Sequence, residues 1–168
     1  MTKVTKAKSA IPSGHHTITP VLVLDNAAQA IAWYEKAFGA SEIGRSTAPD
    51  GKLLHAEIQI GNSRVMLNDE MMNAKSPKTL GGSPASLWIY VEDCDALFKR
   101  ALAAGAHVYG GTVGKMTDQF WGDRAGTVVD PYGFSWTIAS RTEDLSPHEL
   151  EQRQAQWLRD FEPQAMLS

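Results

Sequence analysis

The sequence predicts an α+β protein made of two βαβββ modules, whose curved mixed sheets form a cup with the helices outside, followed by a C-terminal helix. The order strand, helix, three strands occurs twice along the 168 residues. The segment 38–43 (FGASEI) also resembles 104–109 (AGAHVY), and each follows a strand, an aspartate and an apolar-striped helix. Internal repetition of this kind indicates units that do not bury their surfaces alone.

The first module is expected at residues 15–70, after a flexible leader at 1–14. Asp25 and Asn26 are good N-cap residues for a helix that Gly39 ends. Periodic and β-branched runs predict strands at 18–24, 40–46, 54–60 and 64–68. In the third of these strands, one face is expected to carry Leu54, Ala56, Ile58 and Ile60, and the other His55, Glu57 and Gln59.

The second module is expected at residues 85–140, after a linker or lid loop at 71–84. Its helix begins at Asp93 and stops at Gly105. Strands are predicted at 85–91, 107–113, 124–130 and 134–139. In the tail, 141–168, Ser146-Pro147-His148-Glu149 has the pattern of a capping box and opens a helix to about Phe161.

A single helix covers only one face of a four-stranded sheet, so the other face is left for a partner or a ligand. In the strand at 85–91, Trp88 and Tyr90 alternate with Leu87 and Ile89. In the strand at 134–139, Thr137 alternates with its apolar neighbours. The aromatic and hydroxyl set therefore lines the cup as a small-molecule site, or else faces water.

Composition excludes several function classes. The formal charge of −3 and the isoelectric point of about 5.9 argue against binding to nucleic acid or to a membrane surface. No apolar run approaches the roughly 20 residues that span a bilayer. The single cysteine, Cys94, lies among three acids and is expected to be buried and inert. The N-terminus lacks the apolar region of a secretory signal, so a cytoplasmic location is expected.

The segment 119–124 (QFWGDR) packs two aromatic rings, an acid and a base into six residues. The rings are suited to stacking on a planar ligand while Arg124 pairs with an anionic group. Alternatively, Asp123 and Arg124 satisfy backbone groups at a strand entrance and the rings belong to the core. His15 and His16 are expected to form a surface pair beside the leader.

Several motifs together resemble the vicinal oxygen chelate superfamily, which includes glyoxalase I, bleomycin-resistance proteins and extradiol dioxygenases. The resemblance runs from about Thr17 to Glu149. Within the superfamily, the sequence is most similar to the PhnB-like branch. Besides the duplicated module order, it is carried by 38–40 (FGA), 51–57 (GKLLHAE), 65–70 (VMLNDE), 80–84 (LGGSP), 91–93 (VED), 118–124 (DQFWGDR), 130–134 (DPYGF) and 136–139 (WTIA).

Metal-dependent members of this superfamily take one His or Glu-type ligand from each of four strands. The matching positions here are Ile18 or Thr19, Leu67 or Asn68, Ser86, and Thr137. None of them carries a strong donor, and a one-residue slip turns a strand side chain to the opposite face. We therefore expect no metal and no other cofactor.

The leading hypothesis is a protein that binds a small organic molecule without metal and acts by sequestration or resistance, with no catalytic residue. Its expected ligand-binding residues are His55, Glu57, Trp88, Tyr90, Gln119, Trp121, Arg124 and Thr137. The alternative is a glyoxalase-type lyase or isomerase that uses Zn, Ni, Mn or Fe. In this hypothesis His55, Glu57 and either Asp69 or Glu70 serve as metal ligands and general base. A third reading is an interaction module whose cup a partner closes. The resemblance implies a homodimer.

Overall fold

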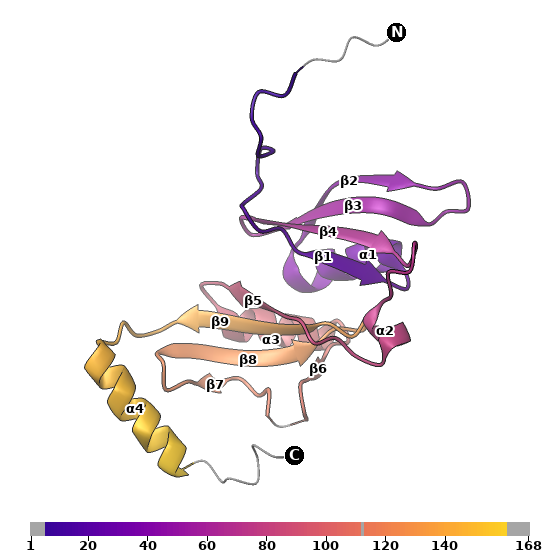
Figure 1. The fold of residues 1–168 in the computed structure, drawn as a ribbon. Helices are drawn as coiled ribbons and strands as arrows, with labels where there is room; N and C mark the ends of the chain where they lie inside the picture. The colour runs from indigo at the N-terminus through magenta and orange to yellow at the C-terminus, as the bar shows by residue number, and fades with distance from the viewer. Residues whose placement is uncertain (1–5, 112, 161–168) are drawn as a thin grey trace. The chain divides into compact units, whose positions relative to one another are not determined.

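The computed structural model describes residues 6–111 and 113–160 (Figure 1). The chain divides into two compact units, residues 1–82 and residues 83–168. Each unit carries a sheet with a helix packed on it, as the repeated pattern predicts. The α+β class, the two βαβββ modules and the C-terminal helix are therefore confirmed. The predicted helix end near Phe161 lies outside the described residues.

The first unit holds a four-stranded sheet of order β1-β4-β3-β2. The edge strand β1 pairs parallel with β4, whereas β3 pairs antiparallel with both β4 and β2. A short helix, α2, lies within the segment that the sequence suggested as a linker or lid. The elements are β1 (Val21–Leu24), α1 (Ala27–Phe38), β2 (Ser41–Thr47), β3 (Leu53–Ile60), β4 (Ser63–Asp69) and α2 (Pro77–Leu80).

The second unit repeats this plan in the order β5-β9-β8-β6, with β5 and β9 parallel. A short additional strand, β7, pairs with β8 and was not predicted. The C-terminal helix begins at the predicted capping box, because Ser146 and Glu149 exchange hydrogen bonds. The elements are β5 (Ser86–Tyr90), α3 (Cys94–Ala103), β6 (His107–Val108), β7 (Thr117–Asp118), β8 (Asp123–Val129), β9 (Ser135–Arg141) and α4 (Pro147–Asp160).

The N-termini of α1 and α3 are held by the same arrangement in both units. The caps Asn26 and Asp93 each accept a hydrogen bond from the amide three residues later. The last strand of each unit then supplies a second acceptor for the first helical amide. Asp69 accepts from the Ala27 amide, and the Ser140 hydroxyl accepts from the Cys94 amide. Parallel pairing of the first and last strands brings these acceptors to the helices.

Two sequence predictions about strands are wrong. Leu54 is 48% exposed, and Leu53 is buried in its place. The register between β2 and β3 skips Leu54, so this bulge reverses the face that the residue presents. The predicted strand 107–113 ends at Val108, and Gly110 and Gly111 follow with φ of 56° and 69°. Positive φ at both glycines turns the chain away from a strand.

The predicted core is otherwise found where period-two and helical spacing place it. Leu24, Tyr34 and Ile58 are fully buried in the first unit. Trp136 and Ile138 are fully buried in the second. Cys94 is a free, buried cysteine, as predicted.

Candidate functional site

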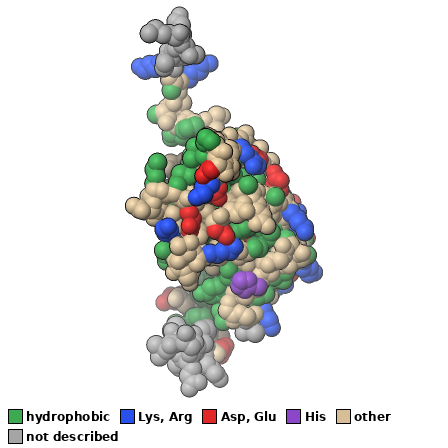
Figure 2. Space-filling view, turned by 90° about the vertical axis from the view of Figure 1, so that its right-hand side faces the viewer, with side chains coloured by type: hydrophobic (Ala, Val, Ile, Leu, Met, Phe, Trp, Pro, Cys, Tyr) green, Lys and Arg blue, Asp and Glu red, His purple; other side chains and the backbone are tan. Residues whose placement is uncertain are grey.

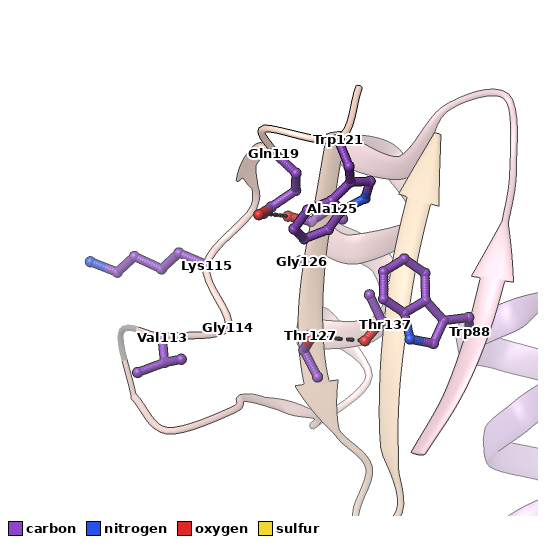
Figure 3. A pocket seen from close by; sticks show the side chains of 10 residues that line it. All are labelled: Trp88, Val113, Gly114, Lys115, Gln119, Trp121, Ala125, Gly126, Thr127 and Thr137. Atoms are coloured by element: carbon purple, nitrogen blue, oxygen red, sulfur yellow. Dashed lines mark hydrogen bonds between the residues drawn. The ribbon is translucent and has the colours of Figure 1, made fainter. Parts of the chain in front are cut away.

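A pocket of about 190 Å³ lies within the second unit, over the strands β5, β9 and β8 (Figure 3). Its walls come from these strands and from the segment that leads from β6 to β8. The lining residues are Trp88, Val113, Gly114, Lys115, Gln119, Trp121, Ala125, Gly126, Thr127 and Thr137. Four of the eight predicted site residues are among them: Trp88, Gln119, Trp121 and Thr137.

The floor of the pocket is a row of side chains across three strands. Trp88 of β5 lies opposite Thr137 of β9, and Thr137 lies opposite Thr127 of β8. The two threonine hydroxyls are 2.9 Å apart and hydrogen-bonded, as the dashed line in Figure 3 shows. Since the neighbouring residue Trp136 is buried in the core, alternation along β9 points Thr137 toward the opposite face. This row combines an indole with hydroxyl groups.

Aromatic rings surround this row. The ring centroids of Trp88 and Trp121 are 6.4 Å apart, with the planes inclined at 51°. Tyr90, next on the same face of β5, lies 5.9 Å from Trp88. Phe120 packs edge-on against Trp121 at 5.0 Å. Trp88, Tyr90, Phe120 and Trp121 thus form one aromatic cluster beside the row.

Asp123 holds part of this aromatic wall in place. Its side chain is buried, and the Tyr90 hydroxyl and the Trp121 indole N–H donate to Oδ2, each at 2.9 Å. Arg141, opposite Asp123 on β9, donates to Oδ1 at 3.1 Å. Burial and the hydrogen bond to Asp123 raise the pKa of Tyr90 above its ordinary value of 10.0. Tyr90 therefore remains a neutral donor at physiological pH.

Arg124, predicted to pair with an anionic ligand group, is not among the residues that line this pocket. Its guanidinium makes two hydrogen bonds to Asp95 of α3, at 2.6 and 2.8 Å, and one to Asp118 at 3.0 Å. The hydrogen bonds that Arg124 donates to Asp95 and Asp118 raise the pKa of Arg124, and the bonds to Asp95 lower the pKa of Asp95. Arg124 thus joins α3 to the sheet.

Gln119 and Lys115 lie at the rim of the pocket. The Gln119 amide nitrogen is 3.3 Å from the Thr117 carbonyl and 3.4 Å from the Ala125 carbonyl. The side chain of Lys115 extends away from the two indole rings in Figure 3. Lys115 therefore contributes its backbone to the wall and leaves its ammonium group outside.

His55 and Glu57 belong to the first unit. The Glu57 carboxylate is 3.2 Å from Nη1 of Arg64 and 3.5 Å from Nε2 of His15. His15 is thus largely buried, and the prediction of a surface pair with His16 holds only for His16, which is exposed. His55 is exposed on β3, opposite Ser46 of β2.

The two acids of the alternative metal site make hydrogen bonds within the fold. Asp69 is buried and accepts from the amides of Ala27 and Leu53, each at 2.7 Å. Glu70 accepts from the amide and hydroxyl of Ser76, which begins α2. Across residues 6–111 and 113–160, no group of three or more His, Cys, Asp or Glu side chains is arranged to hold a metal ion.

Glu70 predicts a pH dependence of stability. Hydrogen bonds from Thr79 and Ser76 lower its pKa from 4.5 to about 2. A lowered pKa stabilises the fold above the unfolded value and is lost as the pH falls toward the folded value. We expect the difference in unfolding free energy between wild type and Glu70→Gln to be constant above pH 4.5 and to vanish near pH 2. Urea unfolding across this range measures it, and a difference that does not change with pH would contradict this role.

The sequence did not point to the wall formed by Val113 and Gly114. The Gly114 carbonyl accepts from the Thr127 amide at 2.8 Å, which brings the loop beside β8. A Cβ at Gly114 would lie 2.4 Å from the Thr127 carbonyl oxygen, so only glycine fits there. The glycine-rich run 110–114 was the available signal, but its partner strand is known only from the fold.

The βαβββ plan is repeated in both units, and the second unit carries a pocket on the open face of its sheet. These features define a class of duplicated βαβββ proteins. The chain belongs to the Glyoxalase/Bleomycin resistance protein/Dioxygenase superfamily, whose family model matches residues 14–138. It is 45% identical over 139 residues to the protein Mb0911c of Mycobacterium bovis, a match that covers 80% of this chain and 89% of that protein.

Solved structures show the same fold. TioX from Micromonospora superposes with a TM-score of 0.59 at 24% identity. The superposition covers 78% of this chain and 100% of TioX. The PhnB protein from Bacillus cereus superposes with a TM-score of 0.56 at 19% identity, covering 74% of this chain and 99% of that one. At these identities the likeness concerns the fold alone.

On the face drawn in Figure 2, basic and acidic side chains are interspersed rather than gathered by sign. Among the described residues, no helix is long and apolar enough to cross a bilayer.

Proposed function

We propose that this protein binds a small organic molecule in the pocket of its second unit, without a metal, and acts by sequestering it. The observation that carries the proposal is the row Trp88–Thr137–Thr127 beneath Trp121, which lines a pocket of about 190 Å³. Small-molecule sites are concave, with aromatic walls and a few placed polar groups. The Trp88 side chain is 47% exposed. A large ring in a hollow surface gains apolar contact when a ligand covers it.

The proposal assigns binding rather than bond-making roles. Thr127 and Thr137 are paired to each other, and the Asp123 carboxylate is occupied by three donors. No nucleophile stands beside a free base among the described pocket residues. The protein is also proposed to be a cytoplasmic homodimer of the PhnB-like branch, supported by the sequence motifs that run from residue 51 to residue 139. Sedimentation equilibrium tests the dimer.

Indole NMR signals test the binding function directly. The chain has five tryptophans, so labelling them with ¹⁵N gives five indole N–H signals. Titration with a set of planar one- and two-ring compounds is expected to shift the signals of Trp88 and Trp121. The signal of Trp136, which is buried in the core, should not move.

Alanine variants sharpen this test. Trp88→Ala is expected to weaken binding of every compound that shifts these signals by about tenfold or more, since an aromatic contact and its buried area are lost. Trp33→Ala, on α1 of the first unit and outside the pocket lining, removes the same side chain and should bind as wild type. Equal affinity of Trp88→Ala and wild type would refute the proposed site.

Metal analysis tests the metal-free part of the proposal. The purified protein is expected to contain Zn, Ni, Mn and Fe only below stoichiometric amounts, and its ligand binding should survive a chelator. One equivalent of any of these metals, lost in His55→Ala together with binding, would overturn it.

A further inference from the structure

We infer that the pocket takes an uncharged, planar ligand that presents a hydrogen-bond acceptor to Nε1 of Trp88; this inference rests on the proposed binding function. It follows from the charges around the pocket, from the unequal state of the two indole N–H groups, and from the pocket's size.

Among the described residues around the pocket, no cation is placed to meet an anionic ligand. Arg124 is held by Asp95 and Asp118. Arg141 is held by Asp123 and by Asp144. The Lys115 ammonium group extends away from the rings (Figure 3). A carboxylate or phosphate that entered would lose its water without gaining a counter-charge, which is costly.

A cationic ligand is disfavoured for the corresponding reason. Asp123, the carboxylate that contacts the aromatic wall through Tyr90 and Trp121, is 1% exposed. Its oxygens already accept from Tyr90, Trp121 and Arg141. Its charge is also balanced by the Arg141 guanidinium at 3.1 Å. The interior of the pocket is therefore polar but without available charge.

The two indole N–H groups differ. Nε1 of Trp121 donates to Asp123, so this ring offers a ligand only its faces and edges. Nε1 of Trp88 makes no hydrogen bond to any described residue, although its ring lines the pocket beside Thr137. A donor at the wall of an apolar site is most favourable when the ligand supplies an acceptor. Trp88 thus provides both a stacking face and a directional contact.

The dimensions restrict the ligand further. The pocket volume of about 190 Å³ is below the roughly 300–1,000 Å³ of sites that enclose drug-sized molecules. With the indole planes inclined at 51°, a flat ring that stacks on one indole is tilted by the same angle against the other. One or two fused rings with a carbonyl or ring-nitrogen acceptor meet these conditions.

Three naphthalenes of matched shape test the charge class. We would titrate the protein with 2-naphthamide, 2-naphthoate and 2-naphthylmethylammonium at pH 7 and follow the ¹⁵N indole signals. The neutral amide is expected to bind at least about tenfold more tightly than either ion. The comparison is repeated with Lys115→Ala, which should leave the preference for the amide over both ions unchanged.

A substitution at Trp88 tests the acceptor contact. Trp88→Phe keeps an aromatic face but removes the N–H group. It is expected to weaken 2-naphthamide binding by about fivefold, in line with the loss of a single hydrogen bond. Binding of 2-methylnaphthalene, which has no acceptor, should change by less than twofold.

The outcomes separate this inference from the proposed function. Tighter binding of 2-naphthoate, abolished in Lys115→Ala, would show that Lys115 turns inward and would overturn the inference while leaving the binding site intact. Tighter binding of the ammonium compound would overturn it likewise, as would equal losses of the amide and the hydrocarbon in Trp88→Phe. If none of the four compounds and none of the screening set shifts the signals of Trp88 and Trp121, both the inference and the proposed function fail.

Discussion

Replacing Asp130 with alanine is expected to lower the free energy of unfolding of the second unit by about 3–5 kcal/mol. Asp130 is 1% exposed at the turn between β8 and β9. Its Oδ1 accepts from the amides of Tyr132 and Phe134, each at 2.9 Å, and its Oδ2 accepts from the Trp136 indole at 2.8 Å. Alanine would leave these three buried donors without their acceptor, which is a costly class of substitution.

Chemical denaturation followed by tryptophan fluorescence measures this loss. The buried indole of Trp136 should also become more mobile when its hydrogen bond is removed. Asp144→Ala supplies the control, because the Asp144 side chain is 98% exposed and such substitutions change stability by about 0.5 kcal/mol or less. A loss below about 1 kcal/mol for Asp130→Ala would show that the turn forms without this carboxylate.

Replacing Asp123 with alanine is expected to weaken binding of 2-naphthamide by about tenfold, because the aromatic wall loses its anchor. Trp121 would lose the acceptor of its indole N–H, and Tyr90 the acceptor of its hydroxyl. Asp123 is a positioning residue here, since it acts through these two rings. The stability cost should be smaller than for Asp130, because Tyr90 and Arg141 are exposed enough for water to replace the carboxylate.

An alkaline titration gives a readout that a general loss of packing would not produce. Asp123 contributes to the raised pKa of Tyr90, so this pKa should fall toward 10.0 in Asp123→Ala, as followed by tyrosinate absorbance. In the wild type, the stability that Tyr90 contributes is complete below pH 10.0 and is lost as the pH rises through its raised pKa. That high-pH loss should be smaller in the variant.

Asp95→Ala is the matched control for Asp123→Ala. It also removes one carboxylate from a partner arginine, Arg124, but outside the pocket lining. Its affinity for 2-naphthamide should equal that of wild type. If Asp95→Ala and Asp123→Ala weaken binding equally, or if Asp123→Ala binds as wild type, then Asp123 does not position the aromatic wall.

Features that depend on neighbours along the chain could be predicted from the sequence. The caps at Asn26 and Asp93 and the capping box at Ser146 act within one turn of a helix, and all three were found as predicted. The alternation of Trp88 and Thr137 with core residues follows from the period of a strand, so it also placed both side chains on the pocket face. These residues needed no knowledge of their partners.

Features that depend on partners far away in the sequence could not be predicted from the sequence. Arg124 lies next to Asp95 because α3 packs on β8, 29 residues away in sequence, and this pairing removed it from the site. A bulge between β2 and β3 turned Leu54 outward, since register is set by the pair of strands and not by one of them.

The sequence by itself determined the two βαβββ modules, the side of β5 and β9 that faces the core, and the aromatic and hydroxyl character of the open face. These follow from local periodicity and from capping chemistry, which are short-range. Only the tertiary structure decided which polar groups remain available for a ligand. Asp123, Arg124 and Arg141 are neutralised by partners on other elements, whereas Trp88 keeps its N–H group without a described partner. Long-range pairing of charges therefore sets the chemistry of the pocket, because a charge already satisfied by the fold has little left to offer a ligand.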